Sequence, residues 1–251
     1  SWIVSGRGEL HLSILIENMR RQGYEMQVSK PEVIVKEIDG VLCEPYEDLQ
    51  LEVPEENVGS VIEALGTRGA EMIQMTNHQN QVRLNYSIPS RGLIGFMTDY
   101  MTMTKGYGII NHTFNSYKPM ADAVVGERKL GVLVSMENGK ASAYGLGQLE
   151  DRGVMFIEPG CEVYEGMIVG ENNRENDLAV NVVKQKQQTN TRSAGKDHTV
   201  VLKRPRKLSL EVCLDYINSD ELVEVTPENF RMRKKILNTE ERKKFDARKN
   251  S

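Results

Sequence analysis

The sequence predicts an α+β protein, in which partial and complete ferredoxin-like α/β sandwich units precede a β-barrel-like C-terminal domain with helices. Three observations support this prediction. Residues 41–120 have the order strand, helix, strand, strand, helix, strand, which is that of a ferredoxin-like sandwich. Residues 127–206 contain short β-type runs separated by turn residues, and residues 1–38 contain one helix between two strands. The expected domains are residues 1–40, 41–125 and 126–251.

The first predicted domain is built on a helix from Glu9 to Arg21, which Gly23 ends. Its apolar residues recur at the spacing of one helical face: Leu12, Leu15, Ile16 and Met19. One helix on two strands buries too little surface to be stable alone. We therefore expect this domain to be a truncated unit, and the chain to be a fragment of a longer protein.

The second predicted domain alternates strands and helices more completely. Leu49, Leu51 and Val53 alternate as in a strand, and a helix follows with Val58, Val61, Ile62 and Leu65 on one face. Two strands come next, at residues 71–75 and 82–88, joined by a turn. A second helix opens at Ser90-Arg91-Gly92, and a last strand covers residues 109–114.

The third predicted domain has the spacing of an antiparallel barrel or sandwich. Its expected strands are residues 131–135, 141–144, 154–156, 162–169, 178–183 and 199–202. A helix with Leu210, Cys213, Leu214 and Ile217 on one face follows them. A strand pair at residues 222–225 and 230–237 then precedes a helix that Asn238 and Glu241 cap.

Charge is strongly segregated along the chain. Residues 181–206 carry seven Lys or Arg and one acid, whereas residues 1–180 have a net charge of −11 and the whole chain −4. Such asymmetry is typical of proteins that bind nucleic acid or membrane surfaces. The cations of residues 181–206 are mixed with Gln, Thr, Asn, Ser and Gly, which contact phosphate and sugar. We call residues 181–206 the basic segment and expect it to bind a polyanion.

No constellation for catalysis or metal binding is present. The sequence has no GxxxxGK[ST] loop and no Gly-x-Ser-x-Gly elbow, and its four His stand apart from further metal ligands. Cys43, Cys161 and Cys213 are far apart, as isolated thiols in a reducing cytoplasm are. No apolar run is long enough to cross a bilayer. We therefore expect a cytoplasmic chain that is not an enzyme, holds no metal or cofactor and makes no membrane contact.

Three charged features have two interpretations each. Arg91 stands at a helix N-terminus, which either holds an RNA phosphate or is a simple strand-to-helix turn. The acidic run from Glu44 to Asp48 is a solvated face or a cation site, and its spacing favours the solvated face. The tail from residue 231 is a second RNA contact, through Arg233, Lys234 and Lys235, or a solvated surface.

Several motifs resemble the elongation factor G class of translational GTPases. The run from Ser5 to Leu12 (SGRGELHL) is similar to the third domain of that class, and the runs at residues 44–47 and 89–95 are similar to its fifth domain. Three C-terminal runs, LEDRG at residues 149–153, EVYEG at 162–166 and DELVEVTP at 220–227, resemble the BipA/TypA family. The resemblance covers essentially the whole chain and identifies it as a C-terminal fragment of that family.

The resemblance implies a ribosome-binding GTPase with roles in stress, low-temperature growth and assembly of the large subunit. It implies that a long loop of the C-terminal domain approaches large-subunit RNA and the acceptor end of an A-site tRNA. The matching residues, together with neighbouring cations, are Lys184, Lys186, Thr189, Asn190, Arg192, Gly195, Lys196, Lys203 and Arg204. Gln185, Gln187 and Gln188 depart from that pattern. GTP and Mg²⁺ would bind to a nucleotide domain that this sequence lacks, so the fragment should not hydrolyse GTP.

A second functional class is a protein-interaction or oligomerisation module without RNA affinity. The truncated first domain should present an unpaired strand edge, and such edges recruit other chains. Truncation could itself create a dimer through that edge.

Overall fold

The computed structural model describes residues 1–78, 80–121, 125–185 and 202–249. Its contacts divide the chain into two compact units. The first unit contains Ser1–Glu9 and Pro31–Glu127, and the second contains Leu10–Lys30 and Arg128–Ser251. Residues 10–30, which the sequence assigned to a domain of their own, thus belong with the C-terminal residues.

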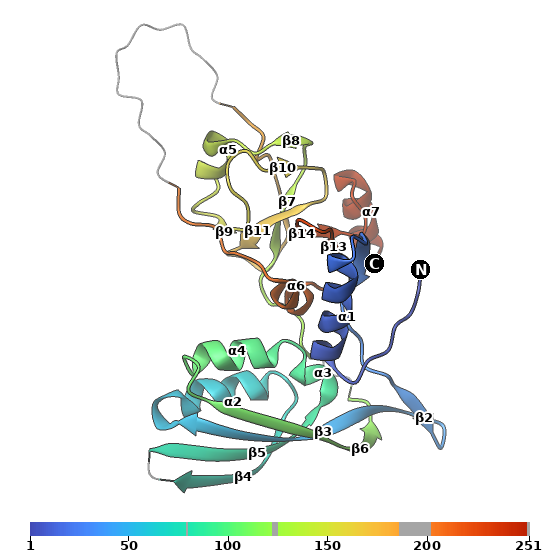
Figure 1. Ribbon diagram of the computed structural model, residues 1–251, viewed down its shortest axis with the longest axis vertical. Helices are drawn as coiled ribbons and strands as arrows, with labels where there is room; N and C mark the ends of the chain where they lie inside the picture. Colours follow the sequence, from blue (N-terminus) through green and yellow to red (C-terminus); the bar gives the residue numbers. More distant parts are fainter. Residues whose placement is uncertain (79, 122–124, 186–201, 250–251) are drawn as a thin grey trace, which may run out of the picture. The chain divides into compact units, whose positions relative to one another are not determined.

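The first unit contains an antiparallel sheet in the ferredoxin-like order (Figure 1). The strand order is β4-β5-β3-β6, and β2 extends the sheet by pairing with the start of β3. The bounds are β2 Lys36–Ile38, β3 Val41–Pro54, β4 Glu71–His78, β5 Gln81–Pro89 and β6 Ile109–Pro119. This order is the one that a strand-helix-strand-strand-helix-strand sequence adopts, so the ferredoxin-like prediction is confirmed.

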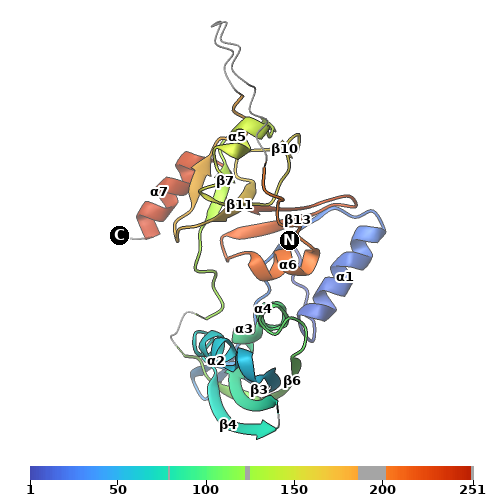
Figure 2. The ribbon, with the colours of Figure 1, turned by 90° about the vertical axis from the view of Figure 1, so that its left-hand side faces the viewer.

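Helices cover one face of this sheet (Figure 2). They are the 3₁₀ turn η1 Glu55–Asn57, α2 Val58–Gly66, α3 Ser90–Leu93 and α4 Phe96–Met103. The alternating Leu49, Leu51 and Val53 of β3 are buried against Val61 and Leu65 of α2, as their spacing predicted. Tyr100 of α4 is fully buried, and its hydroxyl donates to the carbonyl of Glu52 at 2.8 Å.

The described residues of the second unit form three sheets. One has the order β1-β13-β14, one has the order β12-β7-β11-β9, and β8 pairs with β10. The bounds are β1 Met26–Ser29, β7 Val132–Ser135, β8 Gly139–Lys140, β9 Gly153–Met155, β10 Glu162–Val163, β11 Ile168–Asn172, β12 Leu178–Val180, β13 Glu221–Val225 and β14 Phe230–Lys234. Its helices are α1 Glu9–Arg21, α5 Ala143–Gly147, α6 Leu210–Tyr216 and α7 Thr239–Lys249.

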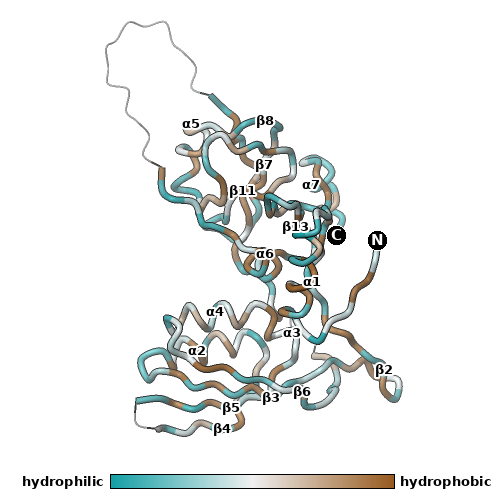
Figure 3. The backbone as a smooth tube through the Cα atoms, viewed as in Figure 1, coloured by the Kyte–Doolittle hydropathy of each residue, from teal (hydrophilic) through white to brown (hydrophobic). Residues whose placement is uncertain are grey.

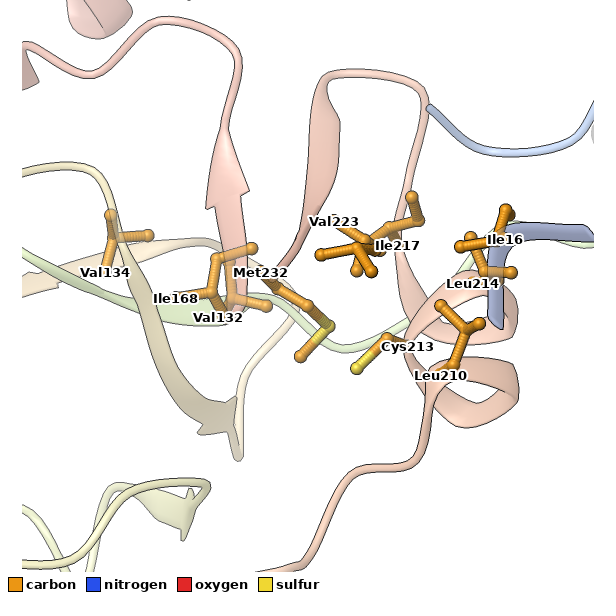
Figure 4. Close-up of a cluster of buried hydrophobic side chains, with 11 residues drawn as sticks. Ile16, Val132, Val134, Ile168, Leu210, Cys213, Leu214, Ile217, Val223 and Met232 are labelled. Carbon is orange, nitrogen blue, oxygen red and sulfur yellow. The ribbon is translucent and has the colours of Figure 1, made fainter. Parts of the chain in front are cut away.

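A shared core explains why residues 10–30 belong to the second unit. Ile16 of α1 packs with Leu214 of α6 and Val223 of β13 in one buried cluster (Figure 4). Met26 and Val28 of β1 pack against the same cluster, and β1 pairs antiparallel with β13. The first predicted domain therefore obtains from the C-terminal residues the apolar surface that it lacks.

The α+β class is confirmed, but the described residues contain no closed barrel. The three sheets of the second unit are separate, and β12 runs parallel to β7. The expected strand at residues 141–144 does not form. Ser142 caps α5 by accepting the N–H of Gly145 at 2.9 Å, and the helix begins at Ala143. Leu15, expected to be buried, is 40 % exposed. In the described ranges, no helix has the length and hydropathy of a membrane span.

Candidate nucleic-acid interface

The basic segment lies only partly within the described residues. Its two ends, residues 181–185 and 202–206, are described. They carry Lys184, Lys203 and Arg204, and all three are exposed. Six further predicted RNA-binding residues lie outside the described residues: Lys186, Thr189, Asn190, Arg192, Gly195 and Lys196.

Local hydrogen bonds hold the first end of the basic segment. The side-chain oxygen of Asn181 accepts the backbone N–H groups of Val183 at 3.0 Å and Lys184 at 2.9 Å, which makes a tight turn. The Ser142 hydroxyl, which caps α5, also donates to the carbonyl of Lys184 at 2.5 Å. Val182 is fully buried within this turn. The backbone is therefore held while the Lys184 ammonium remains in solvent.

A close backbone approach supports the same end. A Cβ atom on Gly145 would lie 2.5 Å from the carbonyl oxygen of Val182, which is closer than real Cβ contacts. Glycine at this position lets α5 contact the turn that begins the basic segment.

The second end runs as an extended, hydrophilic segment after Leu202 (Figure 3). The backbone N–H of Lys203 donates to a carboxylate oxygen of Glu150 at 2.6 Å, and that of Arg206 donates to the carbonyl of Met155 at 2.9 Å. The Arg206 guanidinium pairs with Glu171 at 3.1 Å. Arg206 therefore anchors this end.

At each end of the basic segment, the backbone is therefore held by hydrogen bonds while the cationic side chains are exposed. Among the described residues, the side chains of Lys184, Lys203 and Arg204 have no hydrogen bond or ion pair. Cations that need not leave a protein carboxylate are suited to binding phosphate, because no internal ion pair must be broken first.

Arg91 has a different environment from these cations. Its Nε and Nη2 donate to the carboxylate of Glu44 at 2.6 and 3.1 Å, and Nη2 also donates to the carbonyl of Ala121 at 2.8 Å. Glu44 is fully buried, so the solvated face predicted for residues 44–48 is wrong at that residue. A phosphate that drew Arg91 away would leave this buried carboxylate without its cation, which weighs against an RNA contact there.

Lys234 is also withdrawn from solvent. Its ammonium contacts carboxylate oxygens of Asp177 at 2.5 Å, Asp220 at 2.7 Å and Glu221 at 2.8 Å, and its side chain is 4 % exposed. These three carboxylates are close enough together to hold a metal ion, and the ammonium takes that position. Burial lowers the pKa of Lys234, but the three carboxylates outweigh burial and place that pKa above its ordinary value. Lys234 is therefore not accessible to RNA, and its prediction as an RNA contact is wrong.

The other two predicted tail contacts differ from each other. Lys235 is exposed. The side chain of Arg233 is 16 % exposed and lies 3.6 Å from a Glu224 carboxylate oxygen. Charge density along the sequence could not separate these residues, because burial and pairing depend on how β14 pairs with β13, which carries Glu224.

Sequence reasoning missed the residues that anchor the basic segment. Ser142, Glu150 and Glu171 hold its ends from other elements. Asn181 carried a local signal, since Asn side chains readily hydrogen-bond the backbone two residues ahead, as here with Val183. The other three had none, because their roles depend on tertiary contacts.

Comparisons with known proteins agree with the two-part organisation. Residues 130–239 match the TypA/BipA C-terminal domain, and residues 41–128 match the elongation factor G C-terminus. Three similar relatives are each named large ribosomal subunit assembly factor BipA. The Bacillus subtilis (strain 168) protein is 64 % identical over 99 % of this chain, the Haemophilus influenzae protein 52 % over 96 %, and the Escherichia coli (strain K12) protein 51 % over 96 %.

The chain spans about two fifths of the length of these relatives: 41 % of the B. subtilis protein, 39 % of the H. influenzae protein and 40 % of the E. coli protein. Both matched domains are C-terminal domains of translation-factor families, and the identity extends over nearly the whole chain. The chain belongs to the BipA/TypA family and corresponds to its C-terminal region.

Proposed function

We propose that this chain is the ribosome-docking region of a BipA/TypA translational GTPase, and that it binds ribosomal RNA through the basic segment. The observation that carries the proposal is the pair of anchored ends with Lys184, Lys203 and Arg204, which are exposed and have no side-chain partner among the described residues. The relatives' shared name, large ribosomal subunit assembly factor, supports the large subunit as the partner.

The acceptor end of an A-site tRNA is a second target of the same segment in this proposal. The full-length protein would act in the cytoplasm, hydrolyse GTP with Mg²⁺ in a nucleotide domain, and serve large-subunit assembly under stress or low temperature. The chain described here would supply binding and orientation. Its own contribution is electrostatic, because Lys and Arg that neutralise phosphates release counterions from the RNA.

The test measures binding to RNA extracted from large ribosomal subunits across a salt series. The variant K184A/K203A/R204A should bind more weakly, with a log–log salt slope flatter by about 0.7–0.9 for each lost phosphate contact. The control variant K105A/K129A/R174A removes three exposed cations elsewhere and should retain the wild-type slope. Equal slopes for the basic-segment variant and wild type would refute the proposal.

A protein-interaction module remains the second candidate because α1 exposes apolar side chains. Leu10 is 71 % and Ile14 50 % exposed, one helical turn apart. The strand edge expected to recruit a partner is paired on one side, since β1 pairs with β13. Light scattering separates the candidates: a salt-independent dimer without RNA affinity would favour the module.

A further inference from the structure

The sheet β1-β13-β14 has one face in the core and one face directed away from it. Val223, Val225 and Met232 point into the core. Because side chains alternate along a strand, the residues between them share the opposite face. On β14 these are Arg231 and Arg233, two positions apart, and on β13 they are Leu222 and Glu224.

Glu224 lies between the two arginines on this face. It is directly opposite Arg231 in the strand register, and one of its carboxylate oxygens lies 3.6 Å from Nη1 of Arg233. Its other oxygen accepts the hydroxyl of Tyr164 at 2.6 Å. Tyr164 thus holds the Glu224 carboxylate in place, on a face that has two guanidinium groups and one carboxylate.

The two guanidinium groups have more donors than acceptors. Each carries five N–H groups and stays protonated. Nε of Arg233 is buried and has no hydrogen-bond partner among the described residues. The half-buried Arg231 side chain has no hydrogen bond or ion pair in the described part of the chain. A buried donor without an acceptor is unfavourable, so this face favours a further acceptor.

Other charges near this face lie at its rim. Arg231, Glu158 and Glu162 act on the Cys161 thiol, whose pKa is raised mainly by burial. Glu158 and Glu162 are exposed, and neither forms an ion pair with Arg231 or Arg233 within the described ranges. Gln27 and Ser29 of β1 share the face and are exposed, so they add an amide and a hydroxyl beside the arginines.

We infer that Arg231 and Arg233 form a binding site for one backbone phosphate of RNA, distinct from the basic segment. The inference rests on the proposed function, in which this chain binds ribosomal RNA. A phosphate presents several acceptor oxygens at the spacing of guanidinium N–H groups, and paired arginines bind it through parallel hydrogen bonds. Glu224, held by Tyr164, lies beside the Arg233 guanidinium and helps to position it.

The test compares R231A with wild type in binding to RNA extracted from large ribosomal subunits. Arg231 is the residue to change because its side chain holds no other described group in place. The R231A variant should bind about tenfold more weakly, as expected for loss of a charged hydrogen-bonding group, with a salt slope flatter by about 0.7–0.9. R231K should recover only part of the affinity, because an ammonium lacks the planar fork. R174A is the matched control, being an exposed arginine of the same unit.

The outcomes separate this inference from the proposed function. Loss of affinity in both R231A and K184A/K203A/R204A supports both, and wild-type affinity in R231A with loss in the triple variant overturns the phosphate site alone. Loss in R231A alone supports the site and refutes the basic segment. Wild type that does not bind RNA refutes both. If R231A weakens binding to intact subunits but not to the extracted RNA, the face contacts protein and the phosphate site is overturned.

Discussion

Replacing Lys234 with alanine removes an ammonium that three carboxylates of the second unit share. The Nζ atom contacts Asp177, Asp220 and Glu221 at 2.5, 2.7 and 2.8 Å. The exposed fractions of these three side chains are 42 %, 57 % and 0 %. Only Glu221 would therefore be left in a buried position without this partner.

The size of the effect follows from that burial. Removing one partner of a buried ion pair destabilises a protein by about 3–5 kcal/mol, because the remaining charge stays buried. Arg128 still pairs with Glu221 at 2.9 and 3.0 Å, and the two exposed aspartates regain water. We therefore expect K234A to lower the free energy of unfolding by about 3 kcal/mol, at the lower end of that range.

Hydrogen exchange of peptides that span β13 and β14 measures this loss in the second unit alone. The control D220A removes an exposed partner and should change the free energy of opening by about 1 kcal/mol or less. If these peptides are equally protected from exchange in K234A and in D220A, the ammonium does not stabilise the buried Glu221, and the expected effect of burial is refuted.

Two further predictions concern the first unit. In G108A the new Cβ would lie 2.5 Å from the buried Tyr100 ring, so urea unfolding should show a loss of about 1–3 kcal/mol in stability. The control G59A on α2 has open space around its Cβ and should be neutral or stabilising. Equal stability of the two variants would contradict this packing. The hydrogen bond between His112 and Glu47, at 2.5 Å, raises the pKa of His112 and lowers that of Glu47. The His112 contribution is complete below its unfolded pKa near 6.5 and is lost as pH rises through its raised folded pKa. The Glu47 contribution is present above 4.5, its ordinary value, and is lost as pH falls through the lowered folded pKa. The Tm difference between wild type and H112Q should therefore be largest between about pH 4.5 and 6.5, and a pH-independent difference would exclude this pair as its cause.

Periodicity along the sequence predicted the elements whose partners are close in the chain. The helix with Val58, Val61, Ile62 and Leu65 and the strand with Leu49, Leu51 and Val53 formed as expected, because each has one apolar face and the two pack within the same unit. The strand predicted at residues 141–144 was wrong, because Ser142 caps a helical turn there. Residues 1–40 were predicted to be a separate, truncated domain, because nothing near Ile16 in the sequence shows that Leu214 packs against it.

The charge of the candidate site was visible in the sequence, but the accessibility of each cation was not. Arg91 and Lys234 read as cations equivalent to Lys203 and Arg204, yet both are paired with buried carboxylates. The burial of Cys213, in contrast, was visible in the sequence, because helical spacing placed it on one face of its helix; burial raises its pKa to about 12.

By itself, the sequence determined the α+β class, the ferredoxin-like unit, the family and the concentration of positive charge between residues 181 and 206. These depend on composition, on local periodicity and on contiguous motifs. Only the tertiary structure decided, for the described residues, which cations are unpaired, which are held by carboxylates, and that Arg231 and Arg233 share a face with Glu224. The physical reason is that the free energy of a charge depends on its burial and its partners, and the folding of strands and loops against one another supplies both.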